Sequence, residues 1–227
     1  MRVLKVRSDS MQRASEQTPS GLMTAILGRK SNLNLAMLAA RKWCKEKLCL
    51  NEPIECQIAN YLSAQVRVIG GNKQALDFIE TNYKEFEIVK LKRLPVSGAF
   101  HTKLMQPAEN DLKHVLKEIY IKKPLIQFYS NYDAELVKNP ERIRRNLIKQ
   151  VSNPVRWEQI LNKFYYDENL PTLQDENENN NETKSTPKQS QDRIYPDIYE
   201  CGPGSQTGPI LKIINKKAYQ FYKHISA

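Results

Sequence analysis

Apolar residues recur along the chain with two different periods, and the segments they define predict strands and helices in a regular order. Alternating or continuous apolar runs predict four strands, at residues 21–28, 54–62, 65–71 and 86–94. Apolar residues at helical spacing predict helices at 32–47 and 72–84, the second with Asn72 as its N-cap. The order strand, helix, strand, strand, helix, strand is typical of a ferredoxin-like unit, a scaffold that implies no function by itself.

The flanking parts of the chain follow a different pattern. Helices are predicted at 1–18, 102–120, 140–152 and 155–166, a buried strand at 124–131, and a strand, a Gly-Pro-Gly turn and a helix within 197–214. This alternation predicts an α/β fold with a parallel sheet. Residues 174–193 contain no apolar residue and are predicted to form a disordered loop insertion.

Composition and charge narrow the class of protein. With 227 residues and 40% hydrophobic content, the chain can bury a core of its own. The net charge is +10, but Lys and Arg are spread along the sequence and no DNA-binding or RNA-binding signature accompanies them. We therefore expect a solvated basic surface and no nucleic-acid site. No apolar run approaches the ~20 residues that span a bilayer, so no membrane segment is expected.

The first residues and the cysteines bear on the compartment. Residues 1–15 are basic and contain serine, as transit peptides do, but their apolar residues also fit an amphipathic helix, which we favour. Cys44, Cys49, Cys56 and Cys201 lack the paired C-x-x-C spacing of a zinc site and are expected to be reduced, partly buried thiols of an intracellular protein. These patterns alone favour the cytoplasm.

One of the three histidines lies in an unusual place. His101 follows the small-residue stretch "VSGAF" and precedes a helical pattern, so the chain turns through Gly98 and presents an imidazole at the start of a helix. Loops at the carboxyl edge of an α/β sheet commonly carry binding and catalytic groups. By position alone, a surface or capping histidine is the commoner case, and that is the interpretation we give to His114 and His224.

Four motifs change the interpretation of His101: "VRSDSMQRA", "LPVSGAFHTKLMQPA", "QVSNPVRWEQIL" and "ECGPGSQTGPIL". Together they closely resemble the malonyl-CoA:acyl-carrier-protein transacylase family, especially the mitochondrial form of animals, over nearly the whole chain except 174–193. The resemblance implies an α/β-hydrolase-like large subdomain, incomplete here, with an inserted ferredoxin-like small subdomain. Residues 1–18 and 95–227 would then belong to the large subdomain and residues 19–94 to the small one.

The resemblance also implies the chemistry. In that family a serine in a G-x-S-x-G elbow attacks the malonyl thioester, and a histidine exchanges its proton with the departing coenzyme A and then with the phosphopantetheine thiol of acyl carrier protein. His101 matches that histidine, and Gln150 matches the residue whose main-chain carbonyl orients the imidazole. Arg7 matches the arginine that grips the malonyl carboxylate, because a planar guanidinium makes a bidentate, charge-assisted pair with a carboxylate.

Two further positions match the acyl pocket and the cleft. Phe100 would narrow the acyl pocket and disfavour branched acyl groups. Asn60 matches an asparagine that lines the cleft, although Leu62 stands where the family frequently has a second asparagine. The resemblance further implies malonyl-CoA and acyl carrier protein as partners, no cofactor and no metal, a monomer when complete, and the mitochondrial matrix as the compartment.

The nucleophile elbow is missing from the sequence. Ser97, Ser152 and Ser205 all lack the flanking glycines of G-x-S-x-G. We therefore expect the chain to correspond to the C-terminal portion of the enzyme and to be inactive alone.

Two alternatives stay open. One is a non-catalytic module that binds acyl carrier protein through its basic surface. The other is an acyltransferase domain of a polyketide-type synthase. The end of the chain at Ala227 argues against this second alternative. The presence of Arg7, His101 and Gln150 together favours the enzyme, because a pure binding module has no chemical need for all three.

Overall fold

The computed structural model describes residues 1–47, 54–166 and 195–226. The chain forms two compact units, Met1–Ile160 and Leu161–Ala227. Two predictions from the sequence fall outside the described residues: the disordered loop at 174–193 and the reduced thiol of Cys49.

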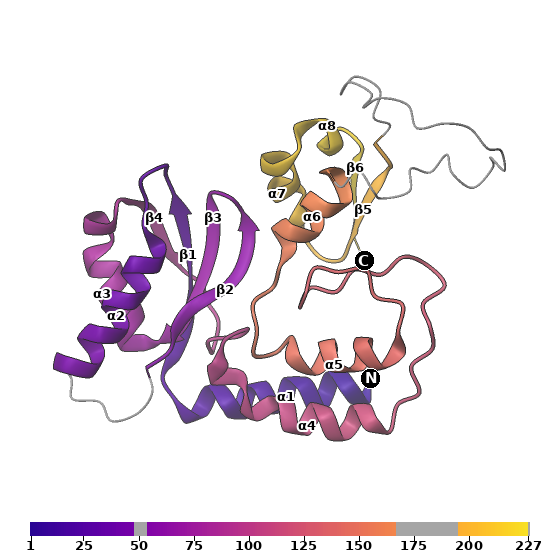
Figure 1. Cartoon of the computed structure of the whole chain (residues 1–227), viewed down its shortest axis with the longest axis horizontal. Coiled ribbons are helices and arrows are strands. Elements are labelled where there is room, and N and C mark those ends of the chain that lie inside the picture. The colour runs from indigo at the N-terminus through magenta and orange to yellow at the C-terminus, as the bar shows by residue number, and fades with distance from the viewer. Residues whose placement is uncertain (48–53, 167–194, 227) are drawn as a thin grey trace, which may run out of the picture. The chain divides into compact units, whose positions relative to one another are not determined.

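The first unit contains a four-stranded antiparallel sheet with two helices on one of its sides (Figure 1). Its elements are β1 (Ser20–Leu27), α2 (Leu33–Lys47), β2 (Cys56–Ser63), β3 (Val66–Asn72), α3 (Lys73–Asn82), the 3-10 turn η1 (Tyr83–Phe86) and β4 (Ile88–Arg93). The strand order is β2-β3-β1-β4, and every pairing is antiparallel. This is the connectivity of a split β-α-β unit, and the order of strands and helices predicted from the sequence is confirmed.

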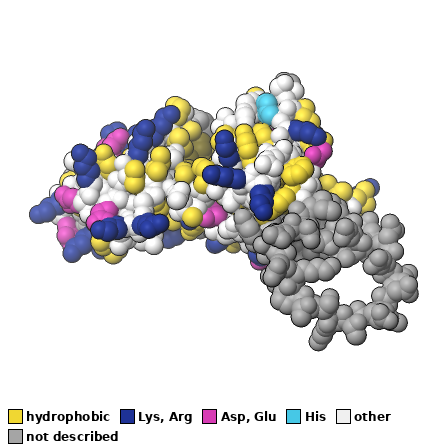
Figure 2. All heavy atoms as spheres, turned by 90° about the horizontal axis from the view of Figure 1, so that it is seen from above, with side chains coloured by type: hydrophobic (Ala, Val, Ile, Leu, Met, Phe, Trp, Pro, Cys, Tyr) yellow, Lys and Arg dark blue, Asp and Glu magenta, His cyan; other side chains and the backbone are white. Residues whose placement is uncertain are grey.

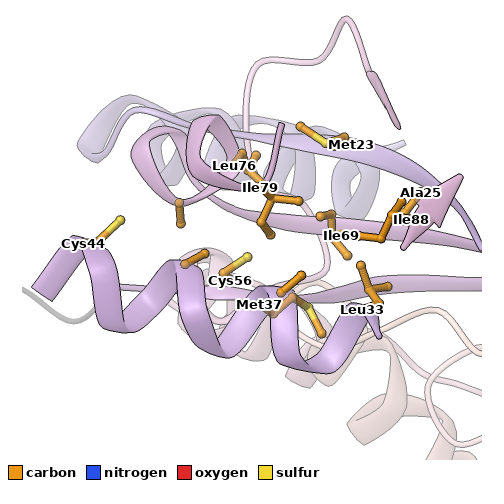
Figure 3. Close-up of a cluster of buried hydrophobic side chains, with 13 residues drawn as sticks. Met23, Ala25, Leu33, Met37, Cys44, Cys56, Ile69, Leu76, Ile79 and Ile88 are labelled. Carbon is orange, nitrogen blue, oxygen red and sulfur yellow. The ribbon is translucent and has the colours of Figure 1, made fainter. Parts of the chain in front are cut away.

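The core of this sheet lies between its strands and the two helices (Figure 3). Leu33, Met37 and Cys44 are buried on one face of α2, as the 3.6-residue period of a helix requires. They belong to the same cluster as Ile69 of β3 and Leu76 of α3, both fully buried. Burying a large apolar side chain stabilises a fold by roughly 1.5–3 kcal/mol, so this cluster holds the helices against the sheet.

A layer of helices completes the first unit (Figure 1). Its elements are α1 (Arg2–Gln17), the 3-10 turn η2 (Lys103–Met105), α4 (Pro107–Lys117) and α5 (Pro140–Lys149). Met11 of α1 and Leu112 of α4 share one buried cluster. Asp111 of α4 accepts hydrogen bonds from Ser10 (2.7 Å) and Arg13 (2.6 Å) of α1, which adds a solvent-exposed polar link between the two helices. The helix predicted at the start of the chain is confirmed, and the one predicted at 102–120 forms as η2 and α4.

The predicted buried strand at 124–131 is wrong. Within the described residues this segment makes one isolated antiparallel bridge, between Tyr129 and Leu136. Leu125 and Ile126 are 102% and 82% exposed. A strand needs a neighbouring strand to pair its N–H and C=O groups, and no described strand lies beside this segment. Its backbone is instead bonded locally, because the N–H of Ser130 donates to the carbonyl of Glu135 (3.0 Å) and the N–H of Val137 donates to the carbonyl of Phe128 (2.8 Å).

The second unit contains a short parallel strand pair. The helix α6 (Trp157–Tyr166) leads into it from the first unit, and its other elements are β5 (Ile198–Cys201), α7 (Thr207–Ile214), α8 (Lys216–Tyr219) and β6 (Tyr222–Ile225). The strands β5 and β6 pair in parallel. Glu200 accepts hydrogen bonds from the N–H groups of Thr207 (2.9 Å) and Gly208 (3.2 Å) at the start of α7. The strand, turn and helix predicted within 197–214 are confirmed. Among the described residues, parallel pairing is limited to β5 with β6 and to one isolated bridge between Asn60 and Val155.

Charge is dispersed over the surface. On the face shown in Figure 2, Lys and Arg side chains lie scattered among hydrophobic and polar ones, which fits a solvated basic surface. Among the described helices, none combines the length and apolarity needed to cross a lipid bilayer.

Candidate active site

His101 lies in the loop between β4 and η2, in a backbone conformation that residues with side chains rarely adopt. Its φ is 63°, in the left-handed region, and such strain costs roughly 1–3 kcal/mol and is common at functional sites. The N–H of His101 donates to the carbonyl of Val151 (3.0 Å), and its Nδ1 lies 2.8 Å from the carbonyl oxygen of Gln150. Two consecutive carbonyls therefore hold both the backbone and the ring of this histidine.

The contact with Gln150 determines which ring nitrogen carries the proton. A carbonyl can only accept a hydrogen bond, so Nδ1 donates and Nε2 of the neutral imidazole keeps a free lone pair. Burial lowers the pKa of His101 below its ordinary value, the Gln150 hydrogen bond opposes this shift, and the positive charge of Arg7 adds to it. The imidazole is therefore neutral at neutral pH and can accept a proton at Nε2 as a general base.

Close packing of small residues fixes the loop that presents His101. A Cβ on Gly98 would lie 2.1 Å from Oγ of Ser15, so α1 passes too close for a side chain at this position. Thr102 is fully buried and donates a hydrogen bond to the carbonyl of Ala99 (2.6 Å), which closes the turn around His101. The small residues of "VSGAF" thus allow the loop to lie against the helix that carries Arg7.

Substituting Gly98 by alanine is expected to destabilise the chain by about 1–3 kcal/mol, because the added methyl group overlaps Ser15. The measurement is the free energy of unfolding from urea titration followed by circular dichroism. Gly21→Ala is the matched control, since a Cβ there would lie 3.8 Å from Leu76, an ordinary contact. A loss no larger than that of the control would contradict the close packing of loop and helix.

Arg7 lies on α1 within electrostatic reach of His101, since its charge lowers the pKa of that histidine. Burial lowers the pKa of Arg7 itself. Among the described residues, no acidic side chain pairs with its guanidinium. A half-buried guanidinium without a partner favours an anionic ligand, with which it can make charge-assisted hydrogen bonds.

Asn60 lies on β2 beside the segment that follows Gln150. The N–H of Tyr61 donates to the carbonyl of Val155 (2.9 Å), and the N–H of Val155 donates to the carbonyl of Ala59 (2.9 Å). Oδ1 of Asn60 is buried and has no hydrogen-bond partner among the described residues. Leaving such an acceptor unsatisfied costs about 1–3 kcal/mol, so this oxygen is available to a ligand or to water.

Phe100 directly precedes His101 and is half-buried. It packs against two separate apolar clusters, one that includes Met11 and Met105 and one that includes Leu22. Contacts with the helical layer and with the sheet therefore both restrain its ring.

The remaining histidines and cysteines that the structure describes are exposed side chains or buried free thiols. The described residues contain no group of three or more His, Cys, Asp or Glu that could hold a metal ion. His114 and His224 are exposed, in keeping with a surface role. Cys44 and Cys56 are buried free thiols, and Cys201 is an exposed one. Burial raises the pKa of Cys56 to about 12, so this thiol stays protonated and unreactive.

Sequence reasoning missed three groups that support the site. Val151 and Ser152 belong to the motif "QVSNP" beside Gln150, so their position in that motif could have drawn attention to them. Glu109 binds Lys149 and Ser152, from which it is separated by 40 and 43 residues. No local pattern marks a contact between residues so far apart in the chain.

The sequence is similar to malonyl-CoA-acyl carrier protein transacylases over nearly its whole length. It is 39% identical to the mitochondrial protein of Mus musculus over 222 residues, which are 98% of this chain and 52% of that protein. It is 37% identical to the mitochondrial protein of Homo sapiens over 222 residues, 98% of this chain and 51% of that protein. No protein-family model matches the sequence.

A solved structure shows the same fold. The crystal structure of the malonyl-CoA:acyl carrier protein transacylase of Xanthomonas oryzae pv. oryzae has a TM-score of 0.72 and 21% identity to this chain, covering 99% of it and 59% of the other chain. The chain therefore has the α/β fold of acyltransferases. Within that class its sequence is homologous to the malonyl-CoA-acyl carrier protein transacylases, and the resemblance predicted from the four motifs is confirmed. The chain spans about half the length of the curated relatives it matches.

Proposed function

We propose that this chain carries the proton-transfer and carboxylate-binding part of an enzyme that moves a malonyl group from coenzyme A to the phosphopantetheine thiol of acyl carrier protein, in fatty acid synthesis. The observation that carries the proposal is the contact between Nδ1 of His101 and the carbonyl of Gln150, which leaves Nε2 as a base near the unpaired Arg7. The relatives are malonyl-CoA-acyl carrier protein transacylases, and the substrates in this proposal are taken from them.

In the proposed mechanism His101 moves one proton in each half of the reaction. Its Nε2 takes the proton of a serine hydroxyl as the serine oxygen attacks the malonyl thioester, and gives that proton to the coenzyme A sulfur as the C–S bond breaks. In the second half Nε2 takes the proton of the phosphopantetheine thiol as its sulfur attacks the malonyl ester, and returns the proton to the serine oxygen. The Gln150 carbonyl stabilises the imidazolium formed in each half.

The nucleophile has to come from elsewhere in this proposal. The sequence contains no G-x-S-x-G motif, and the chain spans about half the length of its relatives. We propose that a segment not included in this sequence supplies the serine, and we call the protein that joins the two the complete enzyme. It would act as a monomer in the mitochondrial matrix, without a cofactor.

The proposal also assigns the parts of the chain. Residues 19–94 would form a ferredoxin-like small subdomain, which the antiparallel order β2-β3-β1-β4 supports. Residues 1–18 and 95–227 would belong to an α/β-hydrolase-like large subdomain. Phe100 would narrow the acyl pocket, and the unpaired amide oxygen of Asn60 would line the cleft.

Incubated with radiolabelled malonyl-CoA, the 227-residue chain is expected to carry no covalent label, because His101 has no elbow serine to activate. The complete enzyme, defined by sequencing the 5′ end of the transcript, is expected to take up label at the serine of an in-frame G-x-S-x-G and to pass it to holo acyl carrier protein. Protein-bound radioactivity after denaturing electrophoresis and mass spectrometry of the labelled peptide are the measurements. Stable label on a serine of the chain alone, or an unlabelled complete enzyme, would refute the proposal.

A non-catalytic module that binds acyl carrier protein is the second candidate, and a basic groove favours it. The groove has a volume of about 660 Å³ and lies between α4 and α5, with Lys113, Lys117 and Arg145 in its lining. Among the described residues these three make no ion pair, whereas Glu109 and Glu141 in the same groove are both paired. Such a surface attracts an acidic protein. A complete enzyme that binds the carrier protein but takes up no malonyl label would support this candidate instead.

A further inference from the structure

Glu109, in the first turn of α4, ties down the segment that presents the carbonyl of Gln150. Its Oε2 lies 2.6 Å from Nζ of Lys149, and its Oε1 accepts a hydrogen bond from the hydroxyl of Ser152. The Glu109 side chain is 12% exposed, Lys149 is 42% exposed and Ser152 is buried. The bond to Ser152 therefore forms largely out of water, where charge-assisted hydrogen bonds are strong, whereas the ion pair with Lys149 is partly solvated. One carboxylate therefore holds the residue before Gln150 and the residue after Val151.

Apart from the two bonds with His101, the other side-chain hydrogen bonds of this segment are local. The side-chain amide of Asn153 donates to the carbonyl of Lys149 (2.8 Å), and that of Gln150 donates to the carbonyl of Asn153 (3.2 Å). These bonds keep the shape of the turn at 149–153, but they do not attach it to another element. Among the described residues, Glu109 is the side chain that joins this turn to α4 by hydrogen bonds.

The helix that carries Glu109 follows directly on the loop that carries His101, through the 3-10 turn η2. The stretch from His101 to Glu109 is therefore fastened to the turn at 149–153 at two points. The first point is His101, bonded to the carbonyls of Gln150 and Val151, and the second is the Glu109 carboxylate. Val151 in the middle of the turn is fully buried in the helical-layer cluster. The Glu109 carboxylate adds a second hydrogen-bonded attachment to that packing and so helps to fix the direction of the turn relative to the imidazole.

We propose that Glu109 is a positioning residue for His101, because it holds Lys149 and Ser152 and so keeps the Gln150 carbonyl aligned with Nδ1 of the imidazole. Without this carboxylate the turn at 149–153 can shift and the hydrogen bond to Nδ1 lengthens. The ring then also populates the tautomer with its proton on Nε2, in which Nε2 cannot accept the serine proton. The catalytic consequence rests on the proposed function, whereas the effect on the imidazole does not.

The test is the tautomer and pKa of His101 in the 227-residue chain, measured by long-range ¹H–¹⁵N spectra of ¹⁵N-histidine-labelled protein over a range of pH. The chain has three histidines, and loss of signals in His101→Ala assigns the relevant ring. The parent is expected to show the Nδ1–H tautomer alone. Glu109→Ala is expected to show a mixture of tautomers and a lower His101 pKa, because the Gln150 hydrogen bond raises that pKa.

Matched variants separate the attachment from the charge. Glu109→Gln removes the same charge but keeps an oxygen that can accept from Ser152, so its tautomer is expected to stay close to that of the parent. Glu141→Ala breaks the ion pair with Arg144 on α5 without altering the contacts of Glu109, and it is expected to leave His101 unchanged. Arg7, whose charge also acts on His101, is present in every variant.

A folded Glu109→Ala chain with a single Nδ1–H tautomer and the parent pKa would overturn the proposal. If Glu109→Ala does not fold, the same spectra of Ser152→Ala decide the question. This variant removes one of the two bonds that Glu109 makes to the turn and removes no charge. In that variant the Nε2–H tautomer is expected to appear, and its absence would equally overturn the proposal.

In the complete enzyme, Glu109→Ala is expected to lower kcat/KM by about tenfold for malonyl and acetyl transfer together, because small misplacements of a catalytic group are costly. Glu109→Gln is expected to recover most of the rate. If the spectra change as expected but no variant of the complete enzyme transfers acyl groups, the positioning role stands and the proposed function fails. If Glu109→Ala leaves the spectra unchanged and the complete enzyme carrying it transfers malonyl groups at the parent rate, the positioning role fails and the proposed function stands.

Discussion

Replacing His101 by alanine in the complete enzyme is expected to slow transfer of malonyl and acetyl groups alike by about 100- to 10,000-fold, the range typical of losing a general base. The substitution removes Nε2, the atom that would accept the serine proton, and both half-reactions depend on it. KM is expected to change little, because the imidazole exchanges a proton and does not hold the acyl group. Single-turnover rates with malonyl-CoA and acetyl-CoA measure the effect.

His114→Ala is the matched control, since it removes a histidine from the exposed face of α4 and is expected to retain full activity. The pH profile adds a second readout. Burial and the charge of Arg7 lower the pKa of His101, so kcat/KM of the parent should decline only below the ordinary histidine pKa of about 6.5. A His101→Ala enzyme as active as the His114→Ala enzyme would show that His101 takes no part in the reaction.

The sheet of the first unit could be predicted from the sequence because its stabilising contacts are largely encoded in local patterns. Leu33, Ala36 and Met37 recur at helical spacing in the sequence, which predicts one apolar helix face, and all three are buried. The segment at 124–131 shows the limit of that reasoning. Its apolar residues have the pattern of a buried strand, but strand formation depends on a neighbouring strand, and no described strand pairs with it.

The candidate site likewise contains residues that the sequence predicts and contacts that it does not. His101, Gln150 and Arg7 were found because each lies in a recognisable motif, and the structure brings the first two into direct contact. The left-handed backbone of His101 and its bond to Val151 arise from tertiary packing, so no sequence pattern marks them. The contacts of the Glu109 carboxylate could not be predicted from the sequence either, because contacts between residues 40 or more positions apart depend on how the helices pack.

Replacing Arg7 by alanine in the complete enzyme is expected to reduce malonyl transfer by about 100-fold or more, since breaking a buried ion pair typically costs roughly 3–5 kcal/mol. Acetyl transfer is expected to persist or increase, because a neutral acyl group no longer faces an unpaired cation. Lysine is expected to restore malonyl transfer poorly, as it lacks the planar two-donor fork of arginine. The malonyl to acetyl ratio of kcat/KM is the measurement.

A second effect of Arg7→Ala follows from its charge. Arg7 lowers the pKa of His101, so its removal is expected to raise that pKa, and the acidic decline of acetyl transfer should move to higher pH. Arg13→Ala is the matched control, because Arg13 lies on the same helix but pairs with Asp111 on α4. It is expected to leave both the ratio and the pH profile unchanged. If the ratio in Arg7→Ala equals that in Arg13→Ala, Arg7 does not bind the malonyl carboxylate, and the assignment of a malonyl substrate loses its physical basis in this chain.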